Sequence, residues 1–529
     1  MRRVFSSVLA AAVAAGLASP AAAKVLTFCA AGGAEGFDPA AYVTGATFDA
    51  SAQTIYDRLV AFEPGTLMPV PGLAESWQVS EDGLEYTFRL REGVAFQTTI
   101  DFRPTRALNA DDVIFSFARQ MDADHPFHDY LGRPWGYFTG LSLDHLIRSL
   151  EKVDERTVKF VLARPDAGFV ASLAMDFASI LSKEYADSLG RERRALLDAR
   201  PIGTGPFQLV TYRPDERINY RAHPEYWGGR QPIGDLVFLI EPDPARRLDM
   251  LKAGACQAMA DPDAAALAAA RADPTLAVTE ADRADIAYLA FNTTQEPFND
   301  ARVRRALAMA IDKQAIVDSV YGELASAADG LVPPGLWSHD DAVGGNEHDP
   351  VAARALLAEA GVEGLTMTLW VSSTRRPYNP DPLKVAGMIA TDLAGIGVEV
   401  AVEPLELGEF LRQSADPGRD GAALFGWTSD NGDPDGIIGV LLSCDAVGIS
   451  NRAAWCDQPF EDLLRTARAT ADRNERRRLY ADAQRIVVEQ APLVPLVHTV
   501  SAVPMSRRVT GLGADPLGRH RFVGVDVGE

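Results

Sequence analysis

Residues 366–402 read TMTLWVSSTRRPYNPDPLKVAGMIATDLAGIGVEVAV, and this stretch decides the fold class. Thr366–Val371 has the pattern of a strand, Leu383–Leu393 that of a helix, and Val398–Val402 that of a second strand. A strand, helix and strand in this order favour a three-layer α/β lobe, because the helix covers the sheet that its neighbouring strands build. We therefore predict an α/β fold.

Segments outside that stretch have the same mixed character. An amphipathic helix is predicted after Asn299-Asp300, with apolar residues on one face at Val303, Ala306, Leu307, Ala310 and Ile311. Strands are predicted at Tyr86–Leu90, Val158–Leu162, Gln208–Val210 and Ala422–Trp427, a helix N-terminus at Asn109–Asp112, and a long helical region over Phe460–Gln490.

Length and charge narrow the class of protein. A chain of 529 residues is too long for one hydrophobic core, so we expect two to four domains at about 150 residues each. Hydrophobic residues make up 47% and charged residues 23%, which is ordinary for a soluble globular protein. The net charge of −22, from 51 basic and 73 acidic residues, repels phosphate backbones. We therefore expect no nucleic-acid partner.

The first 23 residues have the order of a secretory signal peptide. Arg2 and Arg3 give a positive start, Val8–Leu17 is a short alanine-rich apolar stretch, and Pro20-Ala21-Ala22-Ala23 supplies the small residues of a cleavage site. We expect cleavage near Ala23-Lys24 and an exported chain. The apolar run is too short for a membrane span, which needs about 20 residues. An amphipathic or buried N-terminal helix is the alternative.

The four cysteines fit an exported chain. Cys29 follows Leu26-Thr27-Phe28, not the small residues that precede a lipoprotein cysteine, so we expect no lipid anchor. Four cysteines allow three disulfide pairings. Cys444 and Cys456 are twelve residues apart, so a local loop is the simplest pairing, and it leaves Cys29 with Cys256. Free thiols or metal ligation are the alternatives, although no C-x-x-C pair or histidine-rich tract accompanies the cysteines.

Motifs of enzyme chemistry are absent from the sequence. There is no G-x-S-x-G, no H-E-x-x-H and no G-x-x-x-x-G-K-[ST]. The closest histidine pair, His125 and His128, flanks Pro126-Phe127 in a predicted loop, where a zinc site is a remote alternative. We therefore predict no catalytic residues, no metal and no cofactor.

An acidic run, Asp430-Asn431-Gly432-Asp433-Pro434-Asp435-Gly436, follows the predicted strand that ends at Trp427. It is not an EF-hand loop, because Gly432 and Pro434 occupy ligand positions. A carboxylate at a strand end suits a cationic group such as an α-ammonium, since α/β folds bind ligands there. The alternative is a solvated loop whose aspartates cap the next helix.

Several long motifs carry a family resemblance. They are Gly72-Leu73-Ala74-Glu75-Ser76-Trp77, Tyr86-Thr87-Phe88-Arg89-Leu90-Arg91, Leu108-Asn109-Ala110-Asp111-Asp112-Val113, Glu35-Gly36-Phe37-Asp38-Pro39, LAMDFASILSKEYAD over Leu173–Asp187, Arg376-Pro377-Tyr378-Asn379-Pro380, Gly426-Trp427-Thr428 and Asp515-Pro516-Leu517-Gly518. In these motifs the chain resembles the extracellular solute-binding proteins that serve ABC importers of peptides and nickel, above all the members that bind dipeptides. All four cysteines match as well, which favours the pairings above.

The resemblance implies a two-lobed periplasmic binding protein of the class II, cluster C type. After the signal peptide at residues 1–23, an N-terminal lobe would cover residues 24–284 and include an extra subdomain at about 57–205. A second α/β lobe would cover residues 285–500, and residues 501–529 would return to the first lobe. Two hinge segments would join the lobes, and ligand binding would close them.

The resemblance also assigns ligand-binding residues. Arg376 matches the basic residue that pairs with a peptide carboxylate, and Asp430 matches the acidic residue that pairs with the α-ammonium. Arg375 stands where dipeptide-binding members have an uncharged residue. Further residues that match the lining of the pocket are Val43, Thr44, Gly45, Tyr378, Gly426 and Trp427.

The function that follows is capture of dipeptides in the periplasm and delivery to the transmembrane permease subunits of an ABC importer. The protein would act as a monomer. Another small peptide-like solute, such as glutathione, 5-aminolevulinic acid, haem or an oligopeptide, is the alternative within the family. A periplasmic hydrolase is the alternative from another class.

Overall fold

The computed structural model describes residues 24–528, so the predicted signal peptide lies outside the described residues. Within them, twelve strands form one mixed sheet. Ten of these strands lie in the order β16 (Glu399–Leu405), β15 (Thr366–Ser372), β17 (Ala422–Thr428), β13 (Asp285–Phe291), β18 (Leu493–Ser506), β11 (Ala258–Met259), β1 (Val25–Ala30), β10 (Asp235–Ile240), β9 (Arg217–Ala222) and β8 (Phe207–Arg213). The other two, β12 (Leu276–Asp282) and β14 (Ala325–Ala327), also pair with β18.

Smaller sheets and the helices complete the chain. A four-stranded sheet has the order β4 (Ala74–Val79), β5 (Glu85–Leu90), β7 (Thr157–Leu162) and β6 (Ile147–Asp154), and two-stranded sheets pair β2 (Val60–Phe62) with β3 (Pro69–Pro71) and β19 (Val509–Thr510) with β20 (Asp526–Val527). The α-helices are α1 (Gly45–Ala50), α2 (Ala110–Met121), α3 (Gly136–Gly140), α4 (Leu143–Leu146), α5 (Phe169–Ser172), α6 (Lys183–Leu189), α7 (Leu196–Ala199), α8 (Pro244–Lys252), α9 (Ala264–Arg271), α10 (Ala301–Ala310), α11 (Lys313–Ile316), α12 (Pro350–Glu359), α13 (Pro382–Gly395), α14 (Leu407–Ser414), α15 (Ile438–Leu442), α16 (Gln458–Ala469) and α17 (Arg473–Gln490).

The stretch that predicted an α/β fold forms β15, α13 and β16. The two strands pair in parallel from Thr366 opposite Glu399 to Ser372 opposite Leu405. Asp381 caps α13 by accepting a hydrogen bond from the backbone of Lys384, and Pro382 occupies the first turn, where its missing N–H costs nothing. Apolar residues of α10, α13, β13 and β15 share one buried core. The mixed α/β prediction is confirmed.

The predicted helical region over 460–490 contains two helices. A break at residues 470–472 separates α16 from α17, and Asp472 caps α17 by accepting from the backbone of Glu475. An N-cap aspartate starts a new helix because its carboxylate satisfies an amide of the first turn. The helical prediction is confirmed, whereas the break at residues 470–472 was not predicted.

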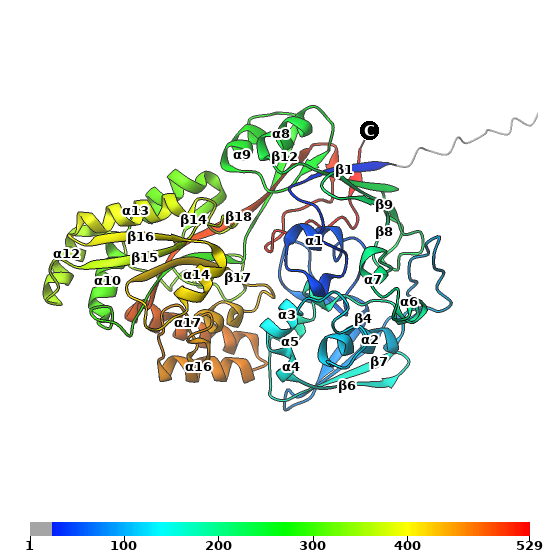
Figure 1. Cartoon of the computed structure of the whole chain (residues 1–529), viewed down its shortest axis with the longest axis horizontal. Helices are drawn as coiled ribbons and strands as arrows, with labels where there is room; N and C mark the ends of the chain where they lie inside the picture. Colours follow the sequence, from blue (N-terminus) through cyan, green and yellow to red (C-terminus); the bar gives the residue numbers. More distant parts are fainter. Residues whose placement is uncertain (1–23, 529) are drawn as a thin grey trace, which may run out of the picture.

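The strand β18 connects two groups of elements. Its first residues pair with β13, and its last residues pair with β11 and β12. Figure 1 shows α10, α12, α13 and β14–β17 together on one side, β1, β8 and β9 on the other, and β18 running between the two groups. The four-stranded sheet packs with α2, whose N-cap Asn109 forms a capping box with Asp112.

Beside β18, a second crossing segment joins β12 to β13. The backbone N–H of Arg283 donates to the carbonyl of Thr499 over 2.8 Å. The Thr499 hydroxyl lies 2.8 Å from both carboxylate oxygens of Asp285, which is fully buried, and Arg283 Nε lies 3.1 Å from the same carboxylate. The two crossing segments are thus bound to each other.

Both predicted disulfides are present, joining Cys29 to Cys256 and Cys444 to Cys456. The first ties β1 to the segment before β11, where a small separate core contains both cysteines. Among residues 24–528, no helix is both long enough and apolar enough to cross a membrane.

Candidate functional site

Two of the predicted site residues follow neighbouring strands. Strands β15 and β17 pair in parallel, with Leu369 opposite Ala422 and Val371 opposite Leu424. Arg376 lies in the loop after β15, and Asp430 lies in the loop after β17. Because parallel strands end at the same edge of a sheet, both loops leave from one edge, which is where open α/β sheets bind ligands.

The loop after β15 holds its arginines in solvent. Arg376 and Asn379 exchange two backbone hydrogen bonds of 3.0 and 2.9 Å, which close a tight turn. The side chains of Arg375 and Arg376 are both exposed. Within the described residues neither guanidinium forms an ion pair, so both can reach a carboxylate that enters from outside.

Tyr378 and Gly426 meet between the two loops. A Cβ at position 426 would lie 2.2 Å from Cδ2 of Tyr378, so only glycine lets the ring pack there. The Tyr378 ring also contacts Phe425, and its carbonyl accepts from the Tyr321 hydroxyl over 3.0 Å. Trp427 is half-buried and its indole N–H donates to the carbonyl of Gly436 over 2.9 Å, which fixes its orientation. Tyr378, Phe425 and Gly426 therefore pack together, and Trp427 follows them at the end of β17.

Asp430 has surroundings unlike those of an ordinary surface aspartate. The Tyr137 hydroxyl, at the start of α3, donates to its carboxylate over 3.1 Å. Burial raises the pKa of Asp430 to about 6, although the nearby Arg519 charge and the Tyr137 hydrogen bond both act to lower it. Arg519 itself donates to Asp176 over 2.9 Å and lies over the Phe48 ring. The carboxylate therefore lacks a dedicated cationic partner.

The predicted N-terminal loop also approaches Arg519. Val43 and Thr44 are exposed at the start of α1, and Thr44 donates to Glu35 over 2.9 Å. A Cβ at Gly45 would lie 3.2 Å from a terminal nitrogen of Arg519. The Arg519 charge also acts on Asp430, so the structure places both Gly45 and Asp430 near the Arg519 guanidinium. Among residues 24–528, no hydrogen bond or ion pair joins Arg376 to Gly45, Asp430 or Arg519.

The other aspartates of the acidic run have structural partners. Asp433 accepts two bonds of 2.8 Å from Arg476 and caps the turn that follows, and Asp435 is paired with Arg468 at 2.9 Å. The interpretation of the run as helix-capping residues is therefore right for Asp433, whereas Asp430 remains outside these pairs.

The loop after β17 also packs against the part of the chain that carries α3–α5. Asn431 donates to Ser172 over 3.1 Å. Helix α16 contacts the same part of the chain, because its Arg468 carbonyl accepts from the backbone N–H of Ala167 over 3.0 Å. A cavity of about 880 Å³ lies between these two parts, with Gly168 and Ser172 on one wall and Asp433 on the other. The loop after β17 therefore lies where two parts of the chain face each other, although none of the predicted ligand-binding residues lines this cavity.

Sequence reasoning missed Tyr137, Asp176 and Arg519. Their contacts join positions up to 343 residues apart in the chain, so no local pattern marks them. Two signals were available: Asp176 lies within the motif over Leu173–Asp187, and Arg519 directly follows the motif that ends at Gly518.

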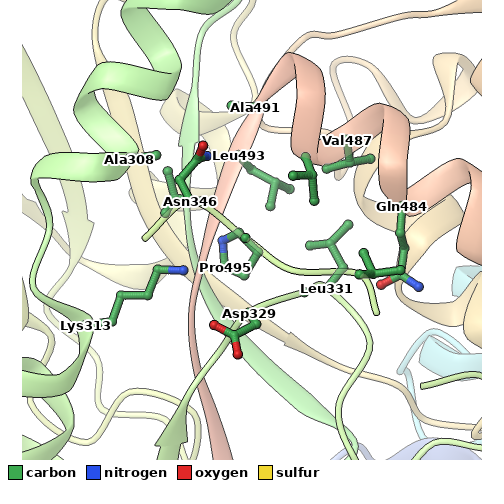
Figure 2. Close-up of a pocket in the computed structure, with 15 residues that line it drawn as sticks. Ala308, Lys313, Asp329, Leu331, Asn346, Gln484, Val487, Ala491, Leu493 and Pro495 are labelled. Carbon is green, nitrogen blue, oxygen red and sulfur yellow. The ribbon is translucent and has the colours of Figure 1, made fainter. Parts of the chain in front are cut away.

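A separate small cavity lies under α17 (Figure 2). Lys313 points toward it and donates to the Ala328 carbonyl over 2.7 Å, and burial lowers the pKa of Lys313 to about 8. Gln484 enters from α17 and its amide nitrogen has no partner within the described residues. A volume of about 20 Å³ suits one ordered water, not a solute. Across residues 24–528 no group of three His, Cys, Asp or Glu side chains is arranged for a metal ion.

Comparisons with known proteins all match the chain to bacterial solute-binding proteins. Residues 68–448 match the family described as bacterial extracellular solute-binding proteins, family 5 Middle. The dipeptide-binding protein of Escherichia coli (strain K12) is 45% identical over 514 residues, which cover 97% of this chain and 96% of that protein.

Two solved structures agree over nearly the whole chain. HbpA2 from Haemophilus parasuis has a TM-score of 0.92 at 39% identity and covers 95% of this chain and 100% of its own. A dipeptide-binding protein from Pseudoalteromonas sp. SM9913 in complex with Met-Leu has a TM-score of 0.79 at 35% identity, again with 95% and 100% covered. The expectation of a two-lobed periplasmic binding protein is confirmed.

Proposed function

The chain belongs to family 5 of the bacterial extracellular solute-binding proteins, and on that premise we propose that it captures dipeptides and delivers them to an ABC importer. The observation that carries the proposal is Asp430, a carboxylate at the end of β17 with no ion pair of its own in the described structure. A site at a strand end with an unpaired carboxylate suits an ammonium group. The dipeptide-binding relatives support the choice of ligand.

In this proposal two charged residues recognise the two ends of the peptide. Asp430 binds the α-ammonium and Arg376 binds the α-carboxylate with its planar guanidinium. Tyr378, Gly426, Trp427 and the loop of Val43, Thr44 and Gly45 would line the space between them. Fixing both ends measures length, because each residue of an extended chain adds about 3.5 Å. Side chains of the ligand would contact walls of low specificity.

In this proposal the boundaries between the two lobes lie at the two crossing segments. Residues 24–284 would form the first lobe, with an inserted subdomain at about 57–205, and residues 285–500 would form the second, after which residues 501–529 return. The bound pair of segments around Arg283 and Thr499 supports hinges at these boundaries. Ligand binding would favour the closed arrangement over the open one.

We infer a place of action from the same premise. The signal peptide predicted at residues 1–23 would deliver the chain to the periplasm, where disulfides form. There it would act as a monomer and present the closed form to the permease subunits of the importer. Cell fractionation of the tagged full-length chain tests this: recovery in the osmotic-shock fraction is expected, and recovery with the cytoplasm would contradict it.

Two measurements test the ligand. Mass spectrometry of the solute that co-purifies with the exported protein should detect dipeptides; haem, glutathione or 5-aminolevulinic acid in their place would support the alternative. Calorimetry should give micromolar or tighter binding of free dipeptides, worth about 8 kcal/mol or more. N-acetylation or C-terminal amidation should each cost about 3–5 kcal/mol, because one buried charge loses its partner. Equal binding of capped and free dipeptides would exclude the two-ended recognition.

A hydrolase remains the alternative from another class. Incubation of the protein with a dipeptide, followed by chromatography, separates the two functions. A binding protein returns the dipeptide intact at any incubation time. Free amino acids that accumulate in proportion to protein concentration would instead establish turnover.

A further inference from the structure

A cavity away from β15 and β17 is lined by two arginines, Arg58 and Arg521. Arg58 has only a loose ion pair, with Asp176 at 3.6 Å, and Arg521 has none within the described residues. The cavity has a volume of about 270 Å³ and lies between the β2–β3 region, Trp227 and the C-terminal segment around Arg521. One water needs only ~10–15 Å³ of such space, so the cavity has room for a hydrated small molecule. Arg58 and Arg521 line it together with the carboxylates of Asp57 and Asp515.

Arg58 is enclosed but incompletely bonded. Its side chain is 8% exposed. One terminal nitrogen donates to the Ala52 carbonyl over 3.1 Å, and the same nitrogen lies 3.6 Å from Asp176, too far for a good hydrogen bond. Its Nε–H has no partner within the described residues. A buried guanidinium donor left unpaired is costly, so it marks a position for an acceptor.

Arg521 adds a second positive charge to the same cavity. Its recorded hydrogen bond runs from one terminal nitrogen to the Phe62 carbonyl, over 2.6 Å. It forms no ion pair within 4 Å among residues 24–528. Burial and repulsion by the neighbouring Arg58 charge lower the pKa of Arg521, whereas the charges of Asp515, Tyr226 and Asp176 act to raise it. An anion between the two guanidinium groups would remove that repulsion.

The carboxylates of the cavity wall already have other donors. Asp57 accepts from the Thr204 hydroxyl over 2.9 Å and from the Trp227 indole over 2.8 Å. Asp515 accepts from the backbone N–H of Leu517 over 2.8 Å. Neither carboxylate lies within ion-pair distance of Arg58 or Arg521 in the described structure. The Nε–H of Arg58 and the Arg521 nitrogens that do not bind the Phe62 carbonyl therefore remain available.

We propose that the cavity between Arg58 and Arg521 binds a small oxyanion, phosphate or a carboxylate, at a site separate from the peptide site. The planar forks of two guanidinium groups match the oxygens of such an anion. The cavity volume accommodates the anion together with waters. This site does not depend on the identity of the transported solute.

Equilibrium dialysis with labelled inorganic phosphate tests the proposal on the mature protein without peptide, at constant ionic strength in chloride. Saturable binding of one phosphate per chain is expected. Arg521→Gln should weaken it at least tenfold, and Arg521→Lys, which keeps the charge but loses the fork, should weaken it less. Arg213→Gln is the matched control, because Arg213 is a 70% exposed arginine paired with Glu216 outside the cavity.

Competition with acetate identifies the class of oxyanion. Displacement of phosphate by acetate assigns carboxylates to the site as well, and failure to displace it restricts the site to phosphate-like anions; both results support it. Circular dichroism and unaltered dipeptide affinity verify that the variants are folded. Phosphate uptake that does not saturate, or that is equal in wild type and Arg521→Gln, would overturn the proposal.

Discussion

Three aspartates within six residues have three different environments, although the sequence presents them as one acidic run. Asp433 and Asp435 each pair with an arginine of the helices α16 and α17. Asp430 receives only a tyrosine hydroxyl and the more distant charge of Arg519. Because they are ion-paired, Asp433 and Asp435 have structural roles. The carboxylate of Asp430 has no ion pair within the described residues, so it is available to a cationic ligand.

The raised pKa of Asp430 predicts pH-dependent affinity. The ionised form binds an ammonium, and in the free protein this form is lost as the pH falls through about 6. Dipeptide affinity should therefore be constant above pH 7 until the peptide amine itself titrates at about 8, and about tenfold weaker at pH 5. Calorimetry between pH 5 and 7 measures the effect. Asp430→Asn should bind weakly with no such slope; an unchanged slope in that variant would assign the titration elsewhere.

Adjacent arginines offer a test of the carboxylate anchor. Arg376→Gln should cost about 2–5 kcal/mol of binding, because it leaves the peptide carboxylate unpaired in the closed site. Arg375→Gln, at the equally exposed neighbouring position, should change affinity by less than about threefold, since a rim charge contributes little. Titration calorimetry of both variants measures the two losses of affinity. A larger loss for Arg375→Gln than for Arg376→Gln would assign the carboxylate anchor to Arg375.

At the scale of elements, one buried carboxylate, that of Asp285, joins the two crossing segments. Asp285 is fully buried and bonded by the hydroxyl of Thr499 on the adjacent strand. Thr499→Val should destabilise the protein by about 1–3 kcal/mol, because that carboxylate loses a donor. Urea unfolding measures the loss. Thr366→Val, on an exposed strand position, should stay within about 0.5 kcal/mol; equal losses would remove the special role of the crossing.

The two disulfides close loops of very different length, which predicts unequal stabilisation. In the chain-entropy model the 227-residue loop of Cys29–Cys256 contributes about 5 kcal/mol and the 12-residue loop of Cys444–Cys456 about 3 kcal/mol. Paired replacement by serine, followed by denaturant unfolding, should show the larger loss for the first bond. A larger loss for the second bond would mean that local packing outweighs loop entropy.

At the scale of the whole molecule, ligand binding should change both shape and stability. A dipeptide held between two lobes favours the closed arrangement, so small-angle scattering should give a smaller radius of gyration with ligand. At a free concentration of 100 times the Kd, the ligand should stabilise the folded state by about 2.7 kcal/mol. Asp430→Asn should show neither change at the same concentration. Stabilisation without contraction would mean that the lobes are already closed.

The sequence by itself determined the fold class, most strands and helices and the family, and it favoured the disulfide pairs that the structure contains. Local patterns suffice for these: residues 366–402 specify strand, helix and strand through their own periodicity, and the long motifs match the family in order. Only the tertiary structure decided which aspartate of the acidic run is free, because Arg468 and Arg476 lie over 30 residues from their partners. It alone brought Tyr137, Asp430 and Arg519 together, and Arg58 next to Arg521. The burial and the charge environment of these side chains depend on residues distant in the chain, and a local sequence pattern does not identify those distant residues.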